Sequence, residues 1–150
     1  MGDKRMVISF FGASFFTRDE ACYNAVMSIL EEKAGESNVE FYLGGKGGFD
    51  SFALECCLDY KAKHKNARVY YISPYMSILS LESSGLHAYD DIIIPEPILT
   101  SLPKFGYLKR NKWMVEQSDF IIFYVPSHAT RSAKALEIAE RKKKEFINLA

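Results

Sequence analysis

The chain has 150 residues, of which 48% are hydrophobic and 25% charged, with 19 basic side chains against 19 acidic ones. This length and composition suit one packed domain and exclude wholesale disorder. The even charge argues against nucleic acid as a partner, because non-specific binding to nucleic acid relies on a net positive field. The longest apolar runs have five or six residues. A membrane span needs roughly 20, so no membrane partner is expected.

Cysteine and histidine are too scattered for a disulfide framework or a metal site. Two of the three cysteines are the adjacent Cys56 and Cys57, and His64, His87 and His128 lie far apart. The first residues run into a strand-like segment without the hydrophobic region of a signal peptide. We therefore expect reduced thiols, a cytoplasmic location, and neither a metal nor a cofactor.

The first elements alternate between an apolar run and an amphipathic stretch. Residues 6–11 are β-branched and aromatic, which predicts a buried strand. Thr17, with Glu20 three residues later, has the capping-box pattern that begins a helix. Residues 39–43 predict the second strand.

A glycine-rich loop, Gly44-Gly-Lys-Gly-Gly-Phe-Asp50, follows that strand and leads into a second helix capped by Asp50 or Ser51. Glycines let the backbone approach a bound group closely, and a helix N-terminus attracts anions. The loop therefore predicts contact with a phosphate or a ribose, with a plain flexible turn as the alternative. It spells neither the dinucleotide fingerprint nor a P-loop. The expected contacts here are Gly44, Gly45, Lys46, Gly47, Gly48, Phe49 and Asp50.

The middle of the chain holds two further strands and one helix. Strands are predicted over residues 68–73 and 91–94, separated by a long loop at residues 74–90 with one helical turn. A helix is predicted over residues 104–117. Its expected inward side chains are Leu108, Trp113, Met114 and Val115.

The last elements complete an alternating order. Residues 119–125 predict a strand, residues 132–144 a helix, and residues 146–149 a final strand. Because the strands are continuously apolar, both of their faces are expected to be buried. The sequence therefore predicts one Rossmann-like α/β domain over residues 1–150, with a mostly parallel sheet of five or six strands and helices on both faces.

Two more loops leave the carboxyl ends of predicted strands, where open parallel sheets bind their ligands. In the loop before the last helix, Arg131 could clamp a phosphate, with an exposed arginine as the alternative. Thr130 or Ser132 could also be the cap of that helix. The expected contacts from these loops are Gly12, Ala13, Ser14, Thr130, Arg131 and Ser132.

Arg110 shares a helical face with Trp113 and Met114 by its spacing, so it projects toward the apolar side. An arginine in that position needs a carboxylate or a ligand phosphate as its partner. The alternative is a solvated basic face shared with Lys109 and Lys112.

Together, the loop over residues 44–50 and the segment Arg110-Asn-Lys-Trp-Met-Val-Glu-Gln-Ser-Asp119 resemble the SLOG superfamily, most of all its YpsA-like branch of small, often phage- or prophage-borne proteins. The likeness runs from Ile8 to Leu149. The superfamily includes nucleotide-sensing modules, the DNA-processing protein that loads recombinase on single strands, and phosphoribohydrolases. The resemblance implies a nucleotide-type ligand over the glycine loop. From the second segment it implies contacts by Arg110, Asn111 and Met114.

The favoured function is capture of a nucleotide or a nucleotide-derived ligand, such as a signalling nucleotide, without turnover. A nucleotide-type small molecule is then the expected partner. The related hydrolases carry a Pro-Gly-Gly-x-Gly-Thr loop and a catalytic glutamate, which this chain lacks, so the sequence leans away from an enzyme.

Two alternatives stay open. An N-glycosidase acting on nucleoside monophosphates would need a carboxylate, and the candidates are Asp50, Glu96 and Glu116. An adaptor that binds single-stranded DNA could stack bases on exposed aromatic rings, although the even charge disfavours it. The candidate rings are Phe15, Phe16 and Phe49. Self-association as a homodimer or a higher homo-oligomer also stays open.

Overall fold

Within the residues that the computed structural model describes, 5–76 and 86–150, six strands form one sheet. Every pair of neighbouring strands is parallel. In spatial order the strands are β4 (Asp91–Ile93), β3 (Ala67–Ile72), β2 (Asn38–Leu43), β1 (Arg5–Gly12), β5 (Phe120–Tyr124) and β6 (Phe146–Asn148). The predicted parallel sheet of a Rossmann-like α/β domain is confirmed.

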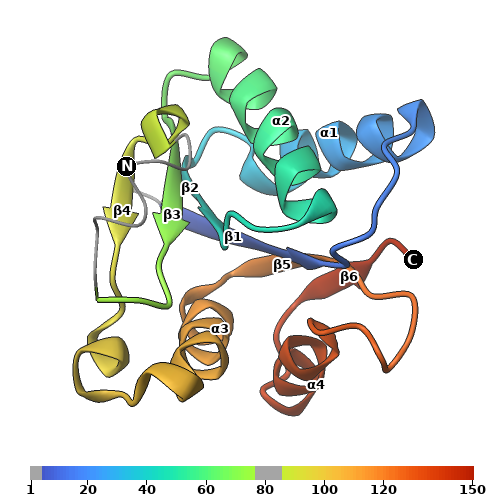
Figure 1. Cartoon of the computed structure of the whole chain (residues 1–150). Helices are drawn as coiled ribbons and strands as arrows, with labels where there is room; N and C mark the ends of the chain where they lie inside the picture. The colour runs from blue at the N-terminus through green and yellow to red at the C-terminus, as the bar shows by residue number, and fades with distance from the viewer. Residues whose placement is uncertain (1–4, 77–85) are drawn as a thin grey trace.

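Helices cover both faces of this sheet, as predicted (Figure 1). The helices are α1 (Glu20–Ala34) and α2 (Gly48–Lys63) on one face, and α3 (Gly106–Gln117) and α4 (Ala133–Arg141) on the other. Successive side chains of β1 point to opposite faces. Ile8 and Phe10 therefore pack with α1 and α2, whereas Val7 and Phe11 pack with α3 and α4. Two apolar layers result, one on each side of the sheet.

The strand order decides where a ligand site can form. The chain moves outward from β1 through β2 and β3 to β4, and then returns to the other side of β1 to form β5 and β6. The direction of winding therefore reverses at β1, and such a reversal opens a crevice at the carboxyl ends of the strands. Between β3 and α3 the chain also forms short 3₁₀ helices, namely η2 (Leu86–Ala88), η3 (Glu96–Thr100) and η4 (Pro103–Phe105).

The start of α1 differs from the prediction. Asp19, not Thr17, is the cap residue, and its carboxylate accepts a hydrogen bond of 2.7 Å from the backbone amide of Cys22. The helix begins at Glu20, so the predicted capping box is wrong. A carboxylate next to the first turn accepts a hydrogen bond from a free amide, and its negative charge interacts favourably with the positive end of the helix dipole.

The start of α2 also differs. Its cap residue is Gly47, with φ of 100°, so the helix begins before the predicted caps Asp50 and Ser51. That backbone conformation suits glycine and turns the chain directly into the helix. Asp50 instead accepts a hydrogen bond of 3.0 Å from the backbone amide of Lys46.

Two predictions about the later helices need correction. Leu108 was expected to point inward, but 48% of it is exposed. The last helix ends at Arg141, before the predicted residue 144, and Lys143 takes a positive φ of 55° that stops it. The loop predicted over residues 74–90 lies partly outside the described residues. In the described parts of the chain, no helix has both the length and the apolar character to cross a membrane.

Candidate functional site

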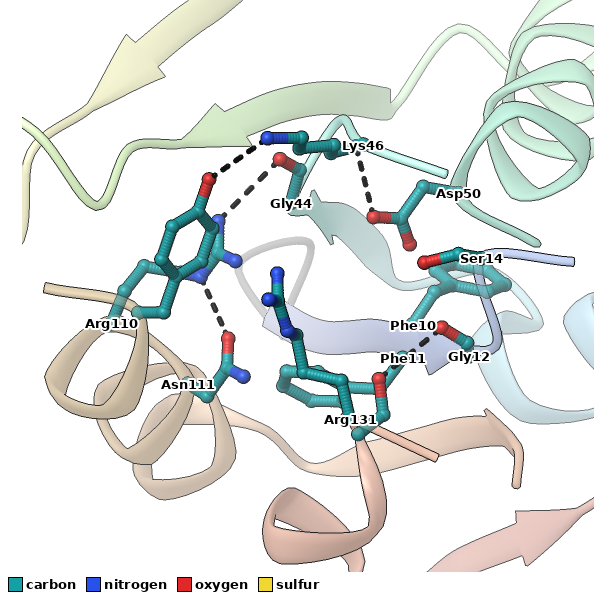
Figure 2. Close-up of a pocket in the computed structure, with 12 residues that line it drawn as sticks. Phe10, Phe11, Gly12, Ser14, Gly44, Lys46, Asp50, Arg110, Asn111 and Arg131 are labelled. Carbon is teal, nitrogen blue, oxygen red and sulfur yellow. Dashed lines mark hydrogen bonds between the residues drawn. The ribbon is translucent and has the colours of Figure 1, made fainter. Parts of the chain in front are cut away.

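A cavity of about 80 Å³ lies at the carboxyl end of β1, where the winding reverses (Figure 2). Loops from both sides of the switch point and the first turns of α3 surround it. The residues that line it are Phe10, Phe11, Gly12, Ser14, Gly44, Lys46, Asp50, Tyr107, Arg110, Asn111, Arg131 and Ser132.

Arg110 is the most deeply placed cation of the cavity, with only 6% of the residue exposed. Its Nη1 donates to the carbonyl of Ile72 at 2.8 Å, and its Nε donates to Oδ1 of Asn111 at 2.7 Å. None of the ion pairs between described residues includes Arg110. Burial lowers the pKa of this guanidinium, and the nearby carboxylate of Asp50 opposes that effect.

Gly44 makes room for this arginine. A Cβ atom at residue 44 would lie 3.0 Å from Nη1 of Arg110, closer than such contacts normally come. The bare backbone therefore lets the guanidinium lie flat against the end of β2. Lys109 and Lys112 are exposed on the same helix. The sequence left open a solvated basic face, and these two lysines form it without Arg110.

Asp50 supplies the one carboxylate among the described residues that line the cavity. Burial raises its pKa to about 6, although the amide of Lys46 and the charge of Arg110 both act to lower it. The cavity thus holds a carboxyl group that titrates close to neutral pH.

Three cationic side chains lie close to the aromatic ring of Tyr107. Its ring centroid lies 5.9 Å from Nζ of Lys46, 5.4 Å from Cζ of Arg110 and 5.7 Å from Cζ of Arg131. The face of an aromatic ring attracts cations over such distances. Burial raises the pKa of Tyr107, but hydrogen bonds with Tyr75 and Lys46 and the nearby positive charges of Lys46 and Arg110 together lower it.

The loop before α4 closes the opposite side of the cavity. Arg131 in this loop is exposed, and its side chain points across the cavity toward Arg110 (Figure 2). Ser132 is the cap residue of α4, but its hydroxyl donates to the carbonyl of Gly12 at 3.2 Å instead of capping the helix. This bond fastens the last loop to the end of β1.

The structure brings together most of the contacts expected from the sequence. Phe10, Phe11 and Tyr107 also line the cavity and were not predicted. Tyr107 stands one helical turn before Arg110, and this spacing could have identified it. The expected contacts that do not line the cavity are Ala13, Gly45, Gly47, Gly48, Phe49, Met114 and Thr130. Met114 and Phe49 are fully buried in the apolar layers.

The three carboxylates considered for catalysis do not lie together in the cavity. Glu96 lies exposed on η3, and Glu116 is exposed and forms an ion pair of 3.2 Å with Lys142. Only Asp50 reaches the cavity. Across the described residues, no group of three or more potential metal ligands is present.

The fold and the site define a Rossmann-like α/β domain with a small, cation-rich cavity at its switch point. Neither a protein-family model nor a curated protein sequence matches the chain. Among solved structures, it is similar to DNA processing protein A from Helicobacter pylori, with a TM-score of 0.63 and 17% sequence identity. The likeness covers 94% of this chain and 63% of that protein, so this chain spans less than two thirds of its length. It shows a shared fold.

The expected partner has to be corrected. The sequence predicted a nucleotide-type small molecule and argued against nucleic acid, whereas the similar Helicobacter pylori protein binds single-stranded DNA. The prediction failed because an even total charge conceals local charge, and here three cations converge on one cavity. The cavity of about 80 Å³ is also much smaller than the roughly 300–1,000 Å³ of ordinary small-molecule sites.

Proposed function

We propose that this domain binds single-stranded nucleic acid and holds one phosphate of the strand in the cavity at the carboxyl end of β1. One observation carries the proposal: Arg110, Lys46 and Arg131 face one cavity, to which the described residues contribute a single carboxylate. Cations gathered in this way attract an anion, and arginine matches the geometry of a phosphate with two parallel hydrogen bonds. The likeness in fold to a protein that binds single-stranded DNA supports the same class of ligand.

Exposed aromatic rings beside the cavity support a strand rather than an isolated ion. Phe15 follows the cavity residue Ser14 and is 96% exposed, and Tyr75 is hydrogen-bonded to Tyr107 at the cavity through their hydroxyl groups at 2.5 Å. Single strands bind through backbone phosphates and through bases stacked on such rings. Phe49, also considered for stacking, is fully buried.

Phe16 is likewise unsuited to stacking a base, because its ring packs against other aromatic side chains. Its centroid lies 4.9 Å from that of Phe52 and 4.8 Å from that of Tyr124. Of the three rings considered from the sequence, Phe15 is the one that the proposal uses.

Membership of the SLOG superfamily is part of this proposal. The sequence resemblance rests on the glycine loop and on the segment that begins at Arg110, and both contribute residues to the cavity. That superfamily includes a DNA-processing protein, and the solved structure that this chain resembles is also a DNA-processing protein.

The proposal is tested by replacing one exposed cation of the cavity. Arg131→Ala is expected to weaken binding of a fluorescent oligothymidine about tenfold in fluorescence anisotropy, because one charged phosphate contact is lost. Arg141→Ala is the matched control, since it removes the same charge at the other end of α4, away from the cavity. Equal losses in both variants, or no binding by the parent protein, would contradict the proposal.

A further inference from the structure

The charges in the cavity do not balance. Lys46, Arg110 and Arg131 contribute three positive charges, and Asp50 contributes at most one negative charge. The excess is therefore two positive charges or more. An internal phosphodiester carries one negative charge, whereas a phosphate monoester carries about 1.5 to 2 near pH 7. A monoester therefore neutralises the excess more completely than a diester does.

Arg110 also has hydrogen-bonding capacity that the described residues do not use. Nε and Nη1 donate to acceptors of the chain, but no described residue accepts a hydrogen bond from Nη2. This side chain is almost completely buried, yet it lines the cavity. Arg131 points toward it, and no carboxylate of a described residue forms an ion pair with either arginine (Figure 2). Two facing guanidinium groups repel each other unless an anion lies between them.

The size of the cavity limits what can reach Arg110. At about 80 Å³ the cavity is far smaller than the roughly 300–1,000 Å³ of sites that enclose whole small molecules. A cavity of this size suits a phosphate group better than it suits a whole nucleoside. Phe10 and Phe11 of β1 form part of the wall. An internal phosphate carries a sugar on both sides, so it reaches a buried guanidinium less readily than an end group, which carries only one.

We propose that the cavity recognises the terminal phosphate monoester of a single strand, in preference to an internal phosphodiester, so that the domain binds strand ends. This inference rests on the proposed function and specifies its ligand. The terminal phosphate is held by Arg110 and Arg131, and the adjoining nucleotides lie outside the cavity near Phe15.

The test compares oligothymidines of about ten nucleotides that differ only at their ends. One carries a 5′-phosphate, one a 3′-phosphate, and one has hydroxyl groups at both ends. A hydroxyl-ended strand that is two nucleotides longer controls for total charge, since each added nucleotide brings one diester. Competition is measured by fluorescence anisotropy. We expect one of the phosphorylated strands to bind about tenfold more tightly than both hydroxyl-ended strands.

The variants used above complete the test. Arg131→Ala should abolish the preference for a phosphorylated end, and Arg141→Ala should keep it. If all strands bind equally and Arg131→Ala still weakens them, the proposed function stands and the recognition of ends is overturned. If no strand binds, both proposals fail together.

Discussion

At the scale of single residues, Asp50 makes the stability of the protein depend on pH. Its pKa in the folded protein is raised to about 6, above the ordinary value near 4 of an aspartate in an unfolded chain. A raised pKa means that the fold disfavours the ionised form. The contribution of Asp50 to the free energy of unfolding is therefore largest below pH 4, and it is lost as the pH rises through about 6.

Asp50→Asn should remove that pH dependence. The amide oxygen can still accept the hydrogen bond from the backbone of Lys46, and no charge is buried. We expect the variant to be more stable than the parent by about 1–3 kcal/mol at pH 7.5, and equally stable near pH 4. Urea unfolding at the two pH values measures both differences. A stability difference of the same size at both would show that burial of the charge is not its cause.

Single residues also show the limit of prediction from sequence. The position of Arg110 toward the apolar side followed from helical spacing, and the structure places it there. Met114 shares that face but lies fully buried beneath the helix. Spacing gives the face of a helix and not the depth of each side chain, because depth depends on the strands against which the helix packs.

At the scale of elements, the strands were easier to predict than the starts of the helices. Buried parallel strands are continuous apolar runs, and all six appear within a few residues of the predicted ranges. A helix start depends on which of several nearby polar groups reaches a free amide. In α1 this group belongs to Asp19, and in α2 glycine geometry replaces a side-chain cap.

The cap of α1 gives a prediction about this element. Asp19→Ala should lower the free energy of unfolding by about 1 kcal/mol, because the amide of Cys22 loses its acceptor. Thr17→Ala serves as the comparison and should leave stability nearly unchanged. Thermal or urea unfolding measures both variants. A larger effect at Thr17 would restore the capping box predicted from the sequence.

At the scale of the whole molecule, the alternation of strands and helices predicted the class of fold, but not the order of strands in the sheet. That order brings together residues that lie far apart in the chain, such as Gly12, Gly44 and Arg131. Total charge is a poor guide to a partner for the same reason: it is a sum over the whole chain, whereas binding depends on the few charges that line one cavity.

The small number of cations at the cavity predicts a weak dependence on salt. Binding to a single strand releases counterions, and the slope of log K against log salt is about −0.7 for each phosphate contacted. One phosphate held by the three cations of the cavity therefore predicts a slope of about −0.7 in a titration with sodium chloride. A slope steeper than about −2 would mean that phosphates of the strand also contact basic residues elsewhere on the surface.

The hydrogen bond between Ser132 and Gly12 has a consequence for the newly made chain. Both arginines of the cavity lie in the last third of the sequence, whereas the glycine loop comes in the first. A nascent polypeptide that has emerged only as far as η4 thus possesses the glycine loop without the guanidinium groups. Under the proposed function, affinity for a phosphate therefore arises late in synthesis, when the C-terminal part closes onto β1.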